Sequence, residues 1–328
     1  MAITAVFGPE GPTLGTEERS FFREADPWGF IVFARNIETP EQVRRLTGDL
    51  RDAVGRDAPV MIDQEGGRVQ RMRAPHWREY LPALDQMQRA TDPLRAMWLR
   101  NRLIAAELHA VGIDVNCAPL ADLLEDDAHE VMRNRLYGSE VETVISAARI
   151  CAEALRAGGV LPVLKHIPGY GRAVVDSHAD LPRVAASQQA LAARDFAPFA
   201  ALSDIAMGMT AHVVYEDIDP ERPATISPIV IELIREEIGF EGLLVTDDLS
   251  MGALSGSVAD RARAAMAAGC DIVLHCNGDR GEMADVAAEC PTLAGQGAAR
   301  AARALRQRQE PAPIDIAASA DELDALIG

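Results

Sequence analysis

Short, nearly continuous runs of apolar residues recur along the chain and alternate with longer segments of helical pattern. The runs are rich in β-branched residues and lack the polar alternation of a half-exposed strand, so they are typical of parallel strands buried on both faces. Such an alternation predicts an α/β fold with a parallel sheet. Eight runs are present: Ile3–Phe7, Gly29–Phe33, Pro59–Ile62, Ile113–Asn116, Leu161–Leu164, Ile205–Thr210, Leu243–Thr246 and Ile272–Leu274.

The segments between the runs carry helix signals, since most begin at a capping residue and end at a glycine. Eight strands that alternate with helices predict a single (β/α)8 barrel of the TIM type over residues 1–328, with residues 290–328 as a C-terminal helical tail packed on it. A doubly wound open sheet is the alternative, but its GxGxxG fingerprint is absent from the sequence. The helical segments are the one opened by Thr39-Pro40, Asp92–Val111, Ser139–Ala157, Ser187–Leu202, the one from Ser227 to Gly239, and Ser257–Ala268.

The charge balance argues against several classes of partner. The chain has 32 Lys and Arg residues against 50 Asp and Glu residues, which gives a net charge of −18. We therefore expect no binding to nucleic acid or to an anionic membrane. The sequence has neither a run of roughly 18 apolar residues nor the features of a signal peptide. The five cysteines show no CxxC spacing, so we expect reduced, buried thiols and a cytoplasmic protein.

Polar residues gather where the predicted strands end. In (β/α)8 barrels the active site lies at the carboxyl ends of the strands. A single polar residue there carries little weight, because strand-to-helix loops are polar in general and Asp is a good helix cap. As a set these residues favour a functional site. The set comprises Asp63 to Arg68, Asp122, Lys165-His166, His212 and Asp247-Asp248.

The strand that begins at Leu243 ends in the motif VTDDLSM. Side chains alternate between the two faces of a strand, so Leu243, Val245 and Asp247 share one side. If that side is the barrel interior, Asp247 emerges at its mouth, where it could be a nucleophile, a metal ligand or an ion-pair partner. Asp248 then turns away, and we expect it to cap or anchor Leu249–Met251.

The motif DQEGGRVQR follows another strand. Asp63 can accept two hydrogen bonds from adjacent hydroxyls of a sugar ring, and Gly66-Gly67 lets the backbone turn sharply. Arg68 and Arg71 could clamp this turn or reach a ligand. We expect Glu65 to serve the structure by pairing with a nearby arginine.

The stretch LKHIPGYGRAVVDSH combines a cation, an imidazole, glycines and an Asp-flanked histidine. Lys165 could form a Schiff base, as in barrel aldolases, or donate hydrogen bonds to substrate hydroxyls. Asp176 and His178 lie two residues apart, so a short extended piece would put both on one side. A carboxylate beside an imidazole raises the imidazole pKa and fixes its tautomer, which prepares a general acid/base.

A metal-dependent hydrolase is a further possibility for a barrel with histidines at its mouth. However, no HxH follows the first strand, no HExxH occurs, and His166, His178 and His212 lack ligand-like spacing. We therefore expect neither a metal nor any other cofactor.

These motifs together resemble the family 3 glycoside hydrolases, and in particular their single-domain bacterial β-N-acetylhexosaminidases. That family carries a motif close to KHFPGHG followed by DSH, where this chain has KHIPGYG and DSH. DQEGGRVQR and the strand-end TDDLSM match as well, and the resemblance runs in order from about residue 1 to residue 280. Two departures are Ile167 in place of Phe and Tyr170 in place of the second His.

The resemblance implies roles for individual residues. Asp247 corresponds to the catalytic nucleophile, His178 to the general acid/base and Asp176 to its partner. The sugar-binding positions correspond to Asp63, Arg71, Lys165, His166 and, through the segment NRLYG, Arg135.

The resemblance also implies a function. We expect a retaining enzyme that removes terminal N-acetylglucosamine from anhydro-muropeptides during cytoplasmic peptidoglycan recycling, through a covalent glycosyl ester on Asp247. Its partner is then a carbohydrate, with no obligate protein partner. The DSH motif, which related β-glucosidases lack, favours N-acetylglucosamine over glucose. The alternatives are a broader β-glycosidase, a Schiff-base aldolase and an inactive sugar-binding barrel.

Overall fold

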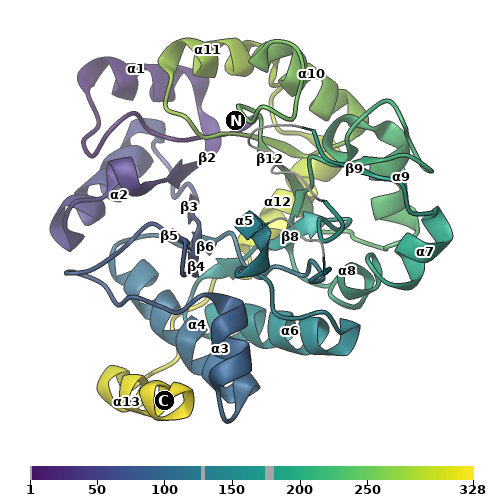
Figure 1. Ribbon diagram of the computed structural model, residues 1–328. Coiled ribbons are helices and arrows are strands. Elements are labelled where there is room, and N and C mark those ends of the chain that lie inside the picture. The colour runs from purple at the N-terminus through teal and green to yellow at the C-terminus, as the bar shows by residue number, and fades with distance from the viewer. Residues whose placement is uncertain (1, 127–129, 174–180) are drawn as a thin grey trace.

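A computed structural model describes residues 2–126, 130–173 and 181–328, and it is a parallel barrel surrounded by helices (Figure 1). The predicted (β/α)8 barrel is thus confirmed, and each of the predicted runs contributes to the main sheet. The strands of this sheet are β1 (Ile3–Phe7), β2 (Pro27–Val32), β3 (Val60–Ile62), β6 (Val115–Asn116), β7 (Leu161–Pro162), β8 (Leu164–Ile167), β10 (Met207–Thr210), β12 (Leu243–Asp248) and β13 (Ile272–His275).

The sheet closes through one divided strand. Its order is β7-β6-β3-β2-β1-β13-β12-β10-β8, so β7 and β8 lie at its two ends, although only Val163 separates them along the chain. The sequence predicted a single strand here. β7 pairs with β6, while β8 pairs with β10 and is bridged through Lys165 to Leu120, beyond the end of β6.

Helices cover the outside of the barrel, and their caps follow the sequence. Side chains of Thr39, Asp92, Ser187, Ser227 and Ser257 each accept a hydrogen bond from a first-turn backbone N–H. The helices are α1 (Thr16–Ala25), α2 (Pro40–Val54), α3 (Ala83–Arg89), α4 (Pro93–Ala110), α5 (Glu130–Arg133), α6 (Val141–Ala157), α7 (Gln188–Ala193), α8 (Ala197–Ala201), α9 (Pro228–Glu236), α10 (Val258–Ala268), α11 (Arg280–Glu289), α12 (Gly295–Leu305) and α13 (Ile316–Ile327), with 3-10 turns η1 (Ala34–Asn36) and η2 (Ala224–Ile226).

Two helix predictions were wrong in detail. Ser187–Leu202 is not one helix but α7 and α8, because Pro198 lacks the N–H that would bond to Arg194 and its ring would clash with that carbonyl. Ser139 does not cap α6, which begins at Val141 after Glu140 with no side-chain cap.

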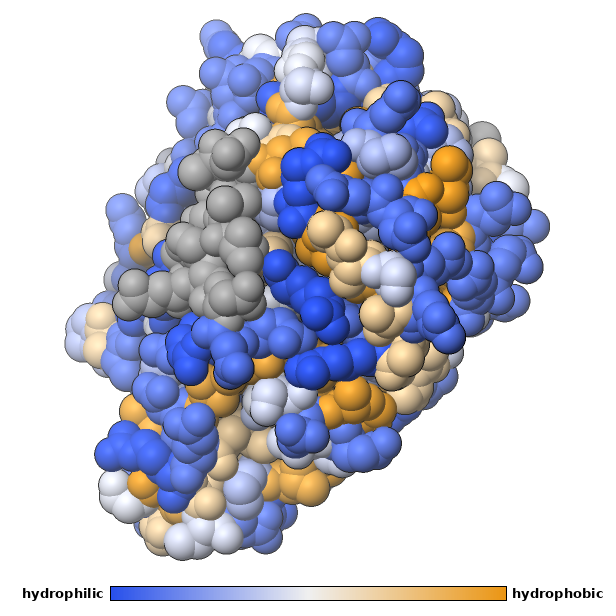
Figure 2. Space-filling model, turned by 45° about the vertical axis from the view of Figure 1, so that its right-hand side comes forward, coloured by the Kyte–Doolittle hydropathy of each residue, from blue (hydrophilic) through white to orange (hydrophobic). Residues whose placement is uncertain are grey.

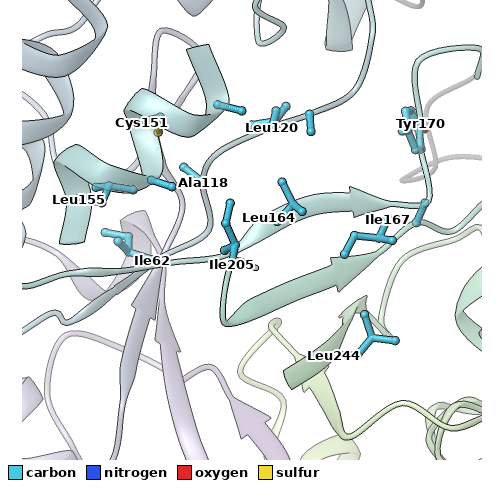
Figure 3. Packing of buried hydrophobic residues seen from close by; sticks show 14 of the residues in the cluster. Ile62, Ala118, Leu120, Cys151, Leu155, Leu164, Ile167, Tyr170, Ile205 and Leu244 are labelled. Atoms are coloured by element: carbon cyan, nitrogen blue, oxygen red, sulfur yellow. The ribbon is translucent and has the colours of Figure 1, made fainter. Parts of the chain in front are cut away.

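Alternate strand residues fill two separate hydrophobic clusters. Leu243 and Val245 belong to the cluster inside the barrel, together with Ile31 and Met61. Leu244 belongs to the larger cluster between strands and helices. Figure 3 shows part of that larger cluster, which includes residues of β3, β8, β12 and α6. Beyond Val245 the pairing of β12 with β13 shifts register, and both Asp247 and Asp248 reach the mouth of the barrel.

The C-terminal segment packs back on the barrel helices. α13 contacts α4 (Figure 1), and Arg95 donates to both carboxylate oxygens of Glu322 at 2.7 and 2.8 Å. Upstream of it, the backbone N–H of Thr4 in β1 donates to the Pro291 carbonyl at 3.0 Å.

The face in Figure 2 is largely hydrophilic, with hydrophobic residues in small separate patches. All five cysteines are buried free thiols, as the sequence predicted. No helix within residues 2–126, 130–173 and 181–328 is both long and apolar enough to span a bilayer.

Candidate active site

A cavity of about 250 Å³ opens at the carboxyl ends of the barrel strands. It brings together six residues that the sequence predicted as site residues: Asp63, Arg71, Arg135, Lys165, His166 and Asp247. The other two, Asp176 and His178, lie outside the described residues, so their roles stay predictions. The remaining lining residues are Ile31, Phe33, Arg68, Val69, Met132, Tyr170, Met209, Asp248, Met251, Leu274 and Cys276.

Lys165 is the centre of a buried charge network. Its Nζ lies 2.9 Å from Asp63 Oδ1 and 2.7 Å from Glu65 Oε1, and its side chain is only 3% exposed. Burial alone would lower the pKa of Lys165, but the two carboxylates outweigh burial and raise it. A Schiff-base lysine must be a neutral amine, so this environment argues against the aldolase alternative.

The two carboxylates are held ionised by the same network. Burial alone would raise the pKa of Asp63, yet Lys165 and Arg71 together hold it well below its usual range. Burial acts in the same direction on Glu65, where Arg135 and Lys165 lower the pKa to about 2. Both groups therefore present charged oxygens at neutral pH.

Arg135 forms a bidentate pair with Glu65, with Nε to Oε2 at 2.9 Å and a terminal nitrogen to Oε1 at 2.8 Å. This pair provides the structural arginine partner that the sequence predicted for Glu65. Arg135 also lines the cavity, so the pair fixes the orientation in which its guanidinium faces a ligand.

Arg71 is fixed from two sides. It donates to Asp63 Oδ2 at 3.1 Å, and its guanidinium lies 5.2 Å from the centre of the Phe33 ring. Its Nε is buried and has no hydrogen-bond partner among the described residues. The sequence did not identify Phe33 as a site residue, because an aromatic residue that ends an apolar run carries no separate signal.

Gly66 and Gly67 make the turn between the short strands β4 (Gln64–Gly66) and β5 (Val69–Gln70). Both have positive φ, and a Cβ on Gly67 would lie 2.8 Å from the Pro82 Cα. Glycine is therefore required for the turn that brings Arg71 back beside Asp63.

Asp247 ends β12 and faces the cavity. Burial alone would raise the pKa of Asp247, but the imidazoles of His212 and His166 and the Asp248 backbone N–H outweigh burial and lower it. The carboxylate is thus ionised at neutral pH, as a nucleophile requires.

Asp248 is an anchor, as the strand alternation predicted. Its Oδ1 accepts from the backbone N–H groups of Ser250 and Cys276 at 3.0 and 3.1 Å, and its Oδ2 accepts from the Ser250 hydroxyl at 2.5 Å. These bonds tie the end of β12 to β13 and engage both carboxylate oxygens of Asp248, although Asp248 also lines the cavity.

Two buried residues near the cavity were noted in the sequence as strand-end residues without a role. His212 bonds Thr225 Oγ1 through Nδ1 at 2.7 Å and the Asp248 carbonyl through Nε2 at 3.0 Å. Asp122 lies 2.8 Å from His166 Nδ1. In the sequence, only their position after a predicted strand pointed to His212 and Asp122. Their hydrogen-bond partners could not be predicted, because those partners are distant in sequence.

The residues before the segment 174–180 are held by three separate bonds. Tyr170 N–H donates to Asp122 Oδ1 at 2.7 Å, the Tyr215 hydroxyl donates to the Gly169 carbonyl at 2.5 Å, and Arg172 Nε donates to Asp195 at 2.9 Å. Across the described part of the chain, no group of three or more His, Cys, Asp or Glu is arranged to hold a metal ion.

Comparison with known proteins agrees with the resemblance. The family model "Glycosyl hydrolase family 3 N terminal domain" matches residues 15–305. A β-hexosaminidase of Alkalilimnicola ehrlichii is 41% identical over 83% of this chain and 80% of its own length.

Two solved structures are similar over nearly the whole chain. NagZ from Neisseria gonorrhoeae, in complex with N-trifluoroacetyl-D-glucosamine, has a TM-score of 0.87 and 29% identity over 100% of this chain and 98% of its own. A family 3 β-N-acetylglucosaminidase from Paenibacillus has a TM-score of 0.87 and 26% identity over 98% of this chain and 66% of its own. The predicted family and enzyme class are confirmed: the chain belongs to glycosyl hydrolase family 3 and is a glycoside hydrolase.

Proposed function

We propose that the protein is a retaining exo-β-N-acetylhexosaminidase that removes terminal N-acetylglucosamine from GlcNAc-1,6-anhydro-muropeptides in the cytoplasm. The observation that carries the proposal is the ionised Asp247 carboxylate facing the same small cavity as the Asp63–Lys165 pair. The names of the similar proteins and the amino-sugar ligand of the Neisseria structure support the choice of sugar.

The cavity favours one terminal sugar unit. Its volume of about 250 Å³ is below the range of roughly 300–1,000 Å³ that larger ligands occupy. The Asp63 carboxylate accepts hydrogen bonds from sugar hydroxyls, and Lys165 and Arg71 donate to them. Because these groups already hold one another, little side-chain conformational freedom is lost when the sugar binds.

The reaction is proposed to proceed in two displacements. Asp247 attacks the anomeric carbon while His178 gives its proton to the glycosidic oxygen, so the C–O bond to the aglycone breaks and a glycosyl ester forms. His178 then takes a proton from water, which attacks the same carbon and releases Asp247. Asp176 stabilises the imidazolium form of His178, which is present before the first displacement and forms again in the second.

A substrate-assisted mechanism would use the 2-acetamido oxygen as nucleophile and a second carboxylate to orient it. Asp248, the neighbouring acid, has both oxygens bonded to Ser250 and one to Cys276 N–H. It is therefore not free to orient an acetamide, which favours direct attack by Asp247.

The proposal is tested by hydrolysis of three substrates: an aryl β-N-acetylglucosaminide, the matching aryl β-glucoside, and GlcNAc-1,6-anhydro-N-acetylmuramic acid. We expect turnover of the first and third and little of the second. Equal turnover of both aryl glycosides would favour the broader β-glycosidase. Failure with the third substrate alone would remove the recycling role and leave the hexosaminidase.

A further inference from the structure

Asp122 lies on the segment that follows β6, and its side chain is 0% exposed. Its Oδ2 lies 2.8 Å from His166 Nδ1, and its Oδ1 accepts from Tyr170 N–H at 2.7 Å. The backbone N–H of His166 lies 3.3 and 3.2 Å from the two oxygens. One buried carboxylate thus receives three N–H groups from the two ends of His166–Tyr170.

We propose that Asp122 is a positioning residue that holds the His166 imidazole with Nε2 as a hydrogen-bond acceptor toward a sugar hydroxyl, and fixes the Tyr170 backbone at the same time. The inference rests on the proposed function, because it takes the ligand of the cavity to be a sugar.

The tautomer follows from what a carboxylate can accept. An ionised carboxylate has no proton to donate, so Nδ1 of His166 must carry the proton that Oδ2 accepts. In the neutral ring Nε2 then keeps its lone pair. His166 lines the cavity, and its Nε2 has no hydrogen-bond partner among the described residues. With the ring neutral, as the proposal requires, the atom presented to the ligand is an acceptor, which complements the donors Lys165 and Arg71.

Asparagine cannot reproduce this arrangement, although it has the same shape. If the amide oxygen takes the place of Oδ1, it still accepts from Tyr170, but the NH2 group faces Nδ1 and the ring must carry its proton on Nε2. If the oxygen takes the place of Oδ2, the tautomer survives, but the NH2 group meets the Tyr170 N–H, donor against donor. Asp122→Asn therefore loses either the tautomer or the backbone anchor.

The tautomer is read directly by NMR of the full chain labelled with ¹⁵N-histidine. We expect wild-type His166 to be protonated on Nδ1, and Asp122→Asn to gain Nε2 protonation or, if it keeps the tautomer, to change the Tyr170 amide resonance. A wild-type His166 that is protonated on Nε2 would overturn the proposal, even if the variant does not fold. This reading needs no substrate, so it stands apart from any failure of the proposed function.

Kinetics separate this role from a purely structural one. We expect Asp122→Asn to lower kcat/KM for an aryl β-N-acetylglucosaminide by about 10- to 100-fold. In a panel of 3-, 4- and 6-deoxyfluoro analogues, fluorine removes the hydroxyl proton that Nε2 accepts. If His166 of the variant carries its proton on Nε2, the fall in kcat/KM caused by Asp122→Asn should be smaller for one of the fluoro analogues than for the parent sugar. A uniform loss across the panel with an unchanged NMR spectrum would contradict the proposal.

Asp195→Asn is the matched control. Asp195 is also a buried carboxylate, but its partner is Arg172 rather than His166. We expect this variant to leave the His166 tautomer unchanged and to affect all sugars of the panel equally. A changed His166 tautomer in the control would show that the effect is not specific to Asp122.

Discussion

Nζ of Lys165 lies 2.9 Å from Oδ1 of Asp63, in a pair whose lysine side chain is 3% exposed. A buried pair of this kind is costly to break, because removing one partner leaves the other charge without compensation. Here two carboxylates would each lose a cation, since Glu65 also pairs with Lys165, and they would keep only Arg71 and Arg135 as partners.

Replacement of Lys165 by Met should therefore affect stability as well as activity. We expect Lys165→Met to lower the free energy of unfolding by about 3–5 kcal/mol and to abolish measurable hydrolysis. Chemical denaturation and an aryl glycoside assay measure both effects. As a control, Arg263→Met removes two surface pairs, with Glu289 and Asp260, in which the arginine side chain is 58% exposed, and it should leave both quantities nearly unchanged. A Lys165 variant of wild-type stability would contradict the account of this network.

His178 should matter in proportion to the leaving group. We expect His178→Ala to slow hydrolysis of substrates with poor leaving groups by about 10²–10⁴, because the glycosidic oxygen is no longer protonated. A nitrophenyl substrate needs no protonation, so it should give a burst of phenol followed by a stalled glycosyl-enzyme. Pre-steady-state kinetics measure the burst. An equal loss for good and poor leaving groups would argue against the acid/base role.

Glu107 should make stability depend on pH. Burial raises the pKa of Glu107 to about 7 from 4.5. Between these two values the folded state binds more protons than the unfolded state, so the free energy of unfolding falls as pH rises and levels off above about 7. We expect Glu107→Gln to remove this fall, so that at pH 8 the variant is more stable than wild type by up to about 3 kcal/mol.

Denaturation at pH 5 and pH 8 measures that difference. At pH 5 Glu107 is protonated in the folded protein, so wild type and variant should be close in stability. An equal stability difference at both pH values would mean that Glu107 does not titrate in this range.

Two glycines allow a matched test of the turn behind Asp63. Gly66 has a φ of +97°, and a Cβ there would overlap the Arg100 guanidinium. We expect Gly66→Ala to destabilise the fold by about 2–4 kcal/mol and to reduce activity, since Arg100 donates to the Glu65 carbonyl. Gly48, inside α2, has open space around its Cβ position, so Gly48→Ala should stabilise by about 0.5–1 kcal/mol. Thermal denaturation distinguishes the two, and equal effects would contradict the argument.

The sequence predicted the barrel because a strand that is buried on both faces is a continuous apolar run, which can be recognised locally. Each of these runs contributes to the sheet. The sequence also predicted that Asp247 reaches the barrel mouth and that Asp248 is an anchor, but Asp248 does not turn away from the cavity, because the strand shifts register between Val245 and Asp248. The bidentate Arg135–Glu65 pair and the Asp122–His166 bond join residues 70 and 44 positions apart. No short pattern records such partners. The break between α7 and α8 could have been predicted from Pro198, whose effect on the preceding turn outweighs the helical pattern around it.

The central claim is that Asp247 attacks the sugar directly. A 5-fluoro-N-acetylglucosaminyl fluoride slows the release of a glycosyl-enzyme, so it should label the full chain once, and mass analysis of the peptides should find the sugar on Asp247 within Leu243–Met251. Asp247→Ala should take up no label. A thiazoline mimic of the acetamide intermediate should inhibit the wild type poorly. Tight inhibition by the thiazoline, with no label on Asp247, would contradict the covalent mechanism.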